Sequence, residues 1–276
     1  MLLNRPICRI LRPAVCSCRT LSSSGVDELE RRLQLLYGHD FRATRPERVY
    51  PSHVRTTAMQ KLGVACQAAL TALRDPHRAD MVAALGDATG RLALERLRDR
   101  MRANATGREL LERRPRVTEA SVGGLEALSA MPPGTFGRCY ADFMRVHTFS
   151  PDERCATRFV DDSELAYVMT RAREVHDFLH VLCGLKPDVP GEIALKWFEM
   201  VHTGLPVAAF SAFVGPSQLS RADKRVLLRQ HIPWAARAGR RARCLLSVDF
   251  EAELHRNRPL KDLQAELLLE PFQTCE

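Results

Sequence analysis

The sequence predicts an all-α protein, organised as a single helical domain with a loop-rich middle segment. Three observations support this fold class. Apolar residues make up 45% of the 276 residues, which is enough to bury a sizeable core. Aromatic residues make up only 6%, whereas Ala, Leu and Arg dominate and favour helices over strands. Apolar side chains also recur at helical spacings of three and four, between breaks made by Pro and Gly.

Residues 1–24 have the composition of a mitochondrial transit peptide. They contain four arginines, a run of serines and no acidic residue, and their apolar side chains have roughly helical spacing. The arginines interrupt the continuous apolar run that a secretory signal needs, and a disordered tail is the alternative. We therefore expect a mitochondrial address at 1–24, followed by an all-helical domain at 25–276.

Helical periodicity continues through the first part of the predicted domain. The expected helices cover residues 26–36, 56–73, 79–85 and 91–104. Pro76 breaks the chain after the second of these helices, and Gly86 and Gly90 are expected to stop the third. The fourth is rich in arginine, and its charges indicate a solvated helix face.

The middle of the chain is predicted to be rich in loops. Pro and Gly are frequent between residues 113 and 159, where we expect one short helix near residues 140–146. A long helix then follows. Asp161, Asp162 or Ser163 can cap its first turn, its apolar residues repeat at three and four, and Gly184 stops it.

The charge distribution argues against a nucleic-acid partner. The formal net charge is +8, but the four arginines before the first acidic residue supply half of it. No basic stripe with interleaved aromatic residues and no known nucleic-acid-binding motif is present. We expect no nucleic acid among the partners.

The most apolar segment, residues 205–214, leaves two interpretations open. Gly and Pro interrupt the longest uncharged run, so no transmembrane helix is expected. The segment can be a buried core helix or a surface helix that faces a membrane.

The candidate site lies in the stretch HDFLHVLCGLKPDVPGE, at residues 176–192. His176 and His180 are four residues apart, so their rings project from one face of the predicted helix, with Asp177 beside them. A loop after Gly184 leads to a helix whose first turn contains Glu192. A helix–loop–helix hairpin of this length can return Glu192 to the imidazoles, which would complete a divalent-metal site.

The same residues also allow an interpretation without a metal. Paired histidines occur by chance on amphipathic helices, and the two carboxylates can be solvated residues near helix ends. The acid that follows the first histidine is Asp, not the Glu that serves as general base in the zinc proteases, so a hydrolase is less favoured. The motifs of acyl, phosphoryl and dinucleotide chemistry are absent.

The sequence around these residues resembles the coenzyme Q biosynthesis protein 4 family of mitochondria. The family's H-D-x-x-H motif, followed by eleven residues and Glu, matches His176, Asp177, His180 and Glu192. Further similar segments occur in the same order, at residues 75–90, 157–180, 191–206 and 233–242. The resemblance covers residues 49–255 and implies that the four motif residues bind a metal, usually zinc.

The resemblance also implies a function. Family members are regarded as decarboxylases (carboxy-lyases) acting at C1 of a 4-hydroxy-3-methoxy-5-polyprenylbenzoate in ubiquinone biosynthesis, and as organisers of the multi-subunit coenzyme Q complex. The expected location is the matrix side of the mitochondrial inner membrane, as a peripheral membrane protein. The expected partners are other proteins of the complex, especially the late-acting hydroxylase, together with the prenylated substrate and the membrane surface. A homo-oligomer stays open. The alternative function is a non-catalytic, lipid-binding scaffold with a structural metal.

Three points remain open in this resemblance. Zinc has no redox chemistry, so an oxidative step would require another ion, and two histidines with a carboxylate also suit Fe²⁺. The sequence names no catalytic acid or base beyond the metal ligands. Near its end the chain departs from the family, with Asp249, Pro259 and a divergent tail after Leu260. The C-terminal helix is therefore in doubt.

Overall fold

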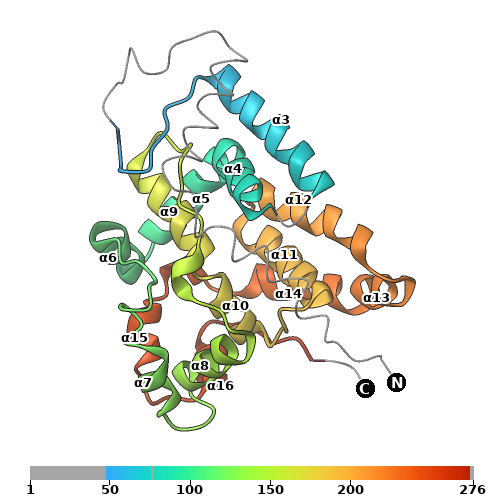
Figure 1. Cartoon of the computed structure of the whole chain (residues 1–276). Coiled ribbons are helices and arrows are strands. Elements are labelled where there is room, and N and C mark those ends of the chain that lie inside the picture. Colours follow the sequence, from blue (N-terminus) through green and yellow to red (C-terminus); the bar gives the residue numbers. More distant parts are fainter. Residues whose placement is uncertain (1–47, 76–77, 274–276) are drawn as a thin grey trace. The chain divides into compact units, whose positions relative to one another are not determined.

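The computed structural model describes residues 48–75 and 78–273, and these ranges are helical, without a β-strand (Figure 1). The predicted all-α class is confirmed. The chain divides into two compact units, Met1–Arg91 with Glu153–Ala166, and Leu92–Asp152 with Tyr167–Glu276. The predicted transit peptide and the helix expected at 26–36 lie outside the described residues. The single domain expected at 25–276 stays a prediction.

The first unit contains the two helices α3 (Ala58–Arg74) and α4 (Ala79–Thr89), which pack against each other. Thr57 caps α3 in a reciprocal capping box with Gln60. This confirms the helix expected at 56–73. The stop predicted at Gly86 is wrong, because Gly86 is buried inside α4 and the helix continues to Thr89. A glycine costs a helix only about 1 kcal/mol, and burial of this turn offsets that cost.

A buried carboxylate anchors the second segment of this unit. Asp87, near the end of α4, accepts hydrogen bonds from the backbone N–H groups of Arg158 and Phe159, at 2.7 and 3.3 Å. The Tyr50 hydroxyl donates to the carbonyl of Val160 at 2.8 Å. These bonds give hydrogen-bond partners to backbone groups of residues 158–160, which do not belong to a helix.

The remaining helices lie wholly or mainly in the second unit, since Arg91 of α5 and Ser163–Ala166 of α9 belong to the first. In chain order they are α5 (Arg91–Arg102), α6 (Ala105–Arg113), α7 (Leu125–Ser129), α8 (Phe136–His147), α9 (Ser163–Glu174), α10 (His176–Cys183), α11 (Val189–Thr203), α12 (Pro206–Val214), α13 (Arg221–Val226), α14 (Ile232–Arg241), α15 (Phe250–Leu254) and α16 (Leu260–Glu266). Short 3-10 turns lie at Pro151–Glu153, Gly215–Gln218 and Leu245–Ser247, and a π-helical turn, Leu227–His231, joins α13 to α14.

An aromatic cluster forms the centre of the core in this unit. The ring of Phe178 on α10 lies 4.6 Å from Tyr140 on α8 and 4.7 Å from Phe250 on α15, measured between ring centroids. All three side chains are almost completely buried. Aromatic rings contribute large buried areas and prefer such tilted contacts. This cluster fixes α10, the helix that carries the two motif histidines.

The loop-rich middle segment contains more helix than the sequence predicted. The short helix expected at 140–146 extends over Phe136–His147, and an additional short helix, α7, precedes it. Thr135 caps α8 by accepting a hydrogen bond from the backbone N–H of Arg138. Most of the prolines and glycines lie between these helices and predicted the loops correctly, whereas Gly137 is buried inside α8.

The long helix expected from Ser163 to Gly184 is divided at Val175 into α9 and α10. Two buried charged residues hold the end of α9 in place. Arg171 donates to the carbonyls of Leu246 and Val248, and Glu174 accepts from the backbone N–H of Val117. The apolar helical pattern of the sequence continues through Val175, but these long-range bonds fix the end of α9 just before it. Tertiary contacts here override the local pattern.

The C-terminal tail closes the far end of α10. The helix leaves the carbonyls of Leu182 and Cys183 without partners inside the helix. The Gln264 side chain donates to the former, and the backbone N–H of Phe272 to the latter, both at 2.8 Å. Two further contacts hold the tail, from Trp234 Nε1 to the Glu270 carbonyl and from Arg243 N–H to the Leu267 carbonyl.

Asp249 and Pro259, the two residues that were expected to depart from the family pattern, each lie at the start of a helix. Asp249 caps α15 by accepting from the backbone N–H of Ala252, and it forms an ion pair with Arg113. Pro259 immediately precedes α16, a position in which the fixed φ of proline is favourable. The C-terminal helix that the sequence left in doubt is therefore present. Among the described residues, no helix combines the length and apolar character that crossing a bilayer requires.

Candidate metal centre

The centre is built on the hairpin formed by α10 and α11. Gly184 ends α10 in the left-handed conformation, with φ of 68°, which glycine adopts at low cost. Asp188 then caps α11 by accepting from the backbone N–H of Gly191 at 2.8 Å, and Pro190 occupies the first turn. Glu192 lies in that same turn. The predicted helix–loop–helix hairpin is confirmed.

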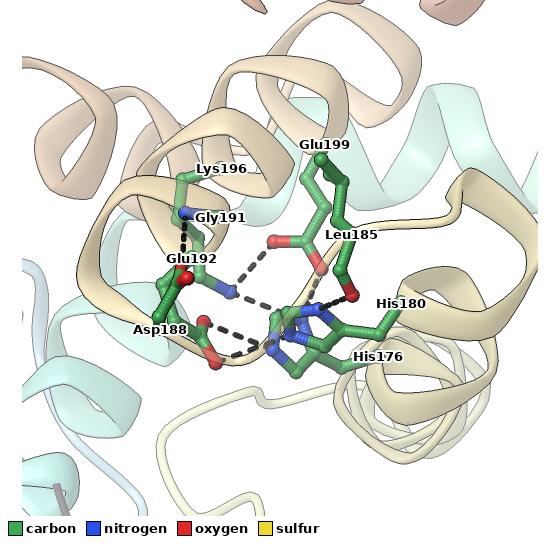
Figure 2. Close-up of polar contacts among 8 residues, drawn as sticks. All are labelled: His176, His180, Leu185, Asp188, Gly191, Glu192, Lys196 and Glu199. Atoms are coloured by element: carbon green, nitrogen blue, oxygen red, sulfur yellow. Dashed lines mark hydrogen bonds and ion pairs between the residues drawn. The ribbon is translucent and has the colours of Figure 1, made fainter. Parts of the chain in front are cut away.

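The hairpin brings both histidines to the Glu192 carboxylate (Figure 2). His180 Nε2 lies 3.1 Å from Glu192 Oε1, and His176 Nε2 lies 3.4 Å from Glu192 Oε2. One potential ligand atom from each residue lies within 4.8 Å of the others. Adjacent ligand atoms around a tetrahedral zinc ion are separated by roughly 3.3 Å. The group is thus close to the spacing that a divalent ion requires.

The second nitrogen of each ring fixes which nitrogen faces Glu192. His180 Nδ1 lies 3.2 Å from the carbonyl of Leu185, which can only accept, so Nδ1 carries the proton. His176 Nδ1 lies 2.7 Å from Glu199 Oε1, and a carboxylate likewise accepts; this contact is shorter than the 3.3 Å to the Lys196 ammonium, which donates. Both Nε2 atoms therefore direct a lone pair toward Glu192 when the rings are neutral.

This arrangement favours a cation. If both rings are neutral, each Nε2 lone pair faces a Glu192 carboxylate oxygen, at 3.1 Å for His180 and 3.4 Å for His176. Two hydrogen-bond acceptors at such distances repel each other. Either protonation of the rings or a bound cation relieves the repulsion, and neutral imidazole with carboxylate is a common ligand set for divalent metals. The residues present therefore fit the metal that the sequence predicts, although the ligand set does not fix its identity.

The two carboxylates of the site stay ionised although they are wholly or partly buried. Burial opposes ionisation of Glu192, but His180 and His176 outweigh it and hold the pKa of its carboxyl well below the ordinary value. Burial also opposes ionisation of Glu199, yet Lys196 and His176 lower its pKa to about 2. Both groups are anionic at neutral pH, so the site attracts positive charge.

Glu199 and Lys196 belong to the site and were missed in the sequence. Glu199 Oε2 accepts from Lys196 Nζ at 2.7 Å, and the same ammonium lies 3.3 Å from His176 Nδ1 (Figure 2). Glu192, Lys196 and Glu199 are spaced by four and three, so they share one face of α11. In the sequence, that spacing was the signal that could have identified Lys196 and Glu199 as neighbours of Glu192. Such carboxylate partners orient metal-binding histidines in many proteins.

Asp177, the fourth predicted ligand, is buried on α10 and is not a member of the group formed by His176, His180 and Glu192. Its role as a ligand stays a prediction. Among the other histidines, His202 has a structural environment. Its Nδ1 donates to the carbonyl of Gly239 at 3.1 Å, and its Nε2 accepts from the backbone N–H of Leu245 at 3.2 Å.

The apolar segment expected at 205–214 forms α12, which packs against the ligand-bearing helix α11. Ala208 and Ala212 are buried, whereas Phe213 is 66% exposed and its ring lies 4.8 Å from that of Trp197 on α11. One face of α12 is therefore buried, as a core helix requires, and the other is exposed; contact of the exposed face with a membrane stays a prediction.

Comparisons with known proteins agree with the motif. The model of the family described as "Coenzyme Q (ubiquinone) biosynthesis protein Coq4" matches residues 50–273. The mitochondrial ubiquinone biosynthesis protein COQ4 homolog of Bos taurus is 46% identical over 219 residues, covering 79% of this chain and 82% of its own. The human homolog is 45% identical with the same coverage, and that of Danio rerio is 43% identical over 86% of each chain.

A solved structure has a similar fold. The crystal structure of a Nostoc punctiforme protein, named for ubiquinone biosynthesis, has a TM-score of 0.59 over 75% of this chain and 97% of its own. At 20% sequence identity, that similarity supports the fold alone.

Proposed function

The chain belongs to the Coq4 family of coenzyme Q (ubiquinone) biosynthesis proteins, and from this premise we propose that it is a metal-dependent decarboxylase. The proposed substrate is 4-hydroxy-3-methoxy-5-polyprenylbenzoate, which loses the carboxyl group at C1. The observation that carries the proposal is the convergence of the His176 and His180 Nε2 lone pairs on the Glu192 carboxylate. The relatives are named as mitochondrial proteins, and the proposed location within the mitochondrion is the matrix face of the inner membrane.

In the proposed mechanism, the residues of the site would have different roles. His176, His180 and Glu192 would hold a divalent cation, and Glu199 would keep His176 in the tautomer that presents Nε2. When bound, the ion would act as a Lewis acid toward the substrate's carboxylate or phenolate and stabilise negative charge on the ring. The Lys196 ammonium would favour an anionic ring at the edge of the site. Burial of both imidazoles excludes water and strengthens these interactions.

Two forms of the reaction are compatible with this site. In the simple form, carbon dioxide leaves and a proton takes its place at C1. In the oxidative form, a hydroxyl group replaces the carboxyl group, and dioxygen would have to accept electrons. Zinc cannot take part in that electron transfer, whereas Fe²⁺ can. Zinc, the metal usual in the family, therefore suits the simple form.

A non-catalytic scaffold is the second candidate. The observation that favours it is the burial of the site. His180 is only 1% exposed, and the three converging side chains, His176, His180 and Glu192, join α10 to α11 as a closed structural site would. In this role the metal would stabilise the hairpin. The chain would organise the other coenzyme Q biosynthesis proteins, especially the late-acting hydroxylase, around lipid intermediates.

A turnover assay with a short-tailed substrate separates the candidates. Protein purified without added metal is analysed for metal content, and the product is identified under air and without oxygen. A decarboxylase loses turnover in the His176→Ala variant while it stays folded, whereas the surface control His255→Ala retains it. Turnover that survives removal of all metal would refute the proposed mechanism. A scaffold instead shows no turnover alone, and loses stability or its partners when the ligands are removed.

A further inference from the structure

Helix α3 carries an apolar stripe on its outward face. Met59, Leu62, Cys66, Leu70 and Leu73 are spaced by three, four, four and three residues, so they occupy one narrow face of the helix. We call these five residues the α3 stripe. The cysteine is exposed, and the exposed fractions of the four large side chains are 70%, 58%, 54% and 50% in chain order. Contiguous exposure of this kind indicates an interaction surface rather than scattered surface residues.

The stripe is separate from the core of its own unit. The opposite side of α3 carries the buried residues Val64, Ala68 and Ala72, and α3 packs against α4 (Figure 1). The helix therefore already has a buried face that accounts for its folding. The stripe is not part of that buried face, and the described part of the chain leaves it exposed.

Basic residues lie at both ends of the α3 stripe. No acidic residue occurs from Arg48 to Arg74. Arg55 is exposed just before the helix, Arg74 is exposed in its last turn, and neither has an ion-pair partner in the described part of the chain. The first acid is Asp75, just past the helix end. The helix thus presents an apolar centre with a cationic group at each end.

We propose that the α3 stripe is the surface with which the protein lies on an anionic lipid bilayer. The apolar side chains would enter the boundary between headgroups and acyl chains, with the helix parallel to the membrane. Arg55 and Arg74 would reach the lipid phosphates at both ends of the helix. A second copy of the chain is a poorer occupant, because stripe-to-stripe packing brings arginine against arginine in either direction. The inference does not depend on the proposed reaction.

Native Cys66 provides a direct test, since it lies in the middle of the stripe. The full chain is alkylated with and without vesicles, and the rate at each cysteine is measured by peptide mass spectrometry. The vesicles contain phosphatidylcholine alone or phosphatidylcholine mixed with phosphatidylglycerol. We expect the anionic vesicles to slow alkylation of Cys66 several-fold, and high salt to weaken the effect. Cys139 and Cys244, which are partly exposed and lie in the other unit, serve as internal references.

A pair of double variants tests the contribution of the apolar side chains. Leu62→Gln with Leu70→Gln should reduce vesicle affinity by about tenfold or more, because two apolar side chains no longer enter the lipid. The matched control is Leu92→Gln with Val146→Gln, which changes two side chains that are 69% and 71% exposed outside the stripe. The control should bind as the unmodified chain does. Circular dichroism verifies that both variants fold.

Three results would overturn the inference. The arginines of residues 1–24 can also attract anionic vesicles, so vesicle binding without protection of Cys66 would assign the contact to another part of the chain. Protection that rises with protein concentration in the absence of vesicles would assign the stripe to a second copy. Equal loss of vesicle binding in the two double variants would show that the stripe has no special role.

Discussion

Replacement of Glu199 by glutamine tests how the protein prepares its metal site. Glu199 is not a predicted ligand, yet its carboxylate lies 2.7 Å from both His176 Nδ1 and Lys196 Nζ. Glutamine keeps the size of the side chain and one acceptor oxygen, but removes the negative charge. The His176 ring then loses a charged partner that holds its Nδ1 proton and raises the basicity of Nε2.

The size of the effect follows from the position of this residue. Mutation of a group that orients a metal ligand typically costs 10–100-fold in metal affinity. Each factor of ten corresponds to about 1.4 kcal/mol, so the expected loss is about 1.4–2.8 kcal/mol of binding free energy. The Lys196 ammonium, freed from its carboxylate, also lies beside His176 and adds repulsion toward an incoming cation. We therefore expect a loss in the upper half of that range.

A competition titration measures this loss. Metal-free protein is titrated with Co²⁺ or Zn²⁺ against a chromophoric chelator, and thermal unfolding is recorded for the same samples. Glu253→Gln is a matched control, since the side chains of Glu199 and Glu253 are both 10% exposed and each pairs with a basic residue. The control should change stability without changing metal affinity. Unchanged affinity in Glu199→Gln, or an equal loss in Glu253→Gln, would refute the reasoning.

Two further predictions concern stability. Burial and the Arg100 charge lower the pKa of His202 to about 4, so the unfolded chain binds more protons between pH 6.5 and 4. The free energy of unfolding should therefore fall by up to about 3 kcal/mol as the pH decreases through this window, as measured by urea unfolding. A His202→Gln variant should show a smaller slope, and an identical slope would contradict the assignment. Gly184→Ala should lower stability by about 1 kcal/mol in thermal unfolding, because alanine resists the positive φ that ends α10. No destabilisation would show that the turn relaxes without strain.

Local sequence rules predicted the parts of the site that depend on local structure. The spacing of His176 and His180, the stop at Gly184 and the restart before Glu192 were sufficient to predict the hairpin and its three converging side chains. The sequence did not reveal Glu199 and Lys196, because an ion pair on a helix face looks the same whether it is solvated or buried beside a histidine. The helical spacing from Glu192 indicated which face they share, but not what that face contacts.

The elements that the sequence described less well depend on long-range contacts. The division of the helix at Val175 accompanies the bonds that Arg171 and Glu174 make to distant loops, and the helical pattern continues through it. Gly86 was expected to end α4, but the helix continues and Asp87 anchors residues 158 and 159. Such outcomes depend on partners more than 50 residues away, which a local pattern does not contain.

The C-terminal tail supports the helix that carries the two histidines of the metal centre. Three of its hydrogen bonds with the rest of the unit use its main-chain atoms, namely the N–H of Phe272 and the carbonyls of Leu267 and Glu270. The side chains of Leu267, Leu269 and Phe272 also pack into the core of the unit. Main-chain groups are the same in every residue type, apart from the missing N–H of proline. These three hydrogen bonds therefore tolerate a change of side chain, whereas the packing of the buried apolar side chains does not. An insertion that shifts the backbone of the tail would disturb both kinds of contact, so it would be more harmful than a substitution at one exposed position.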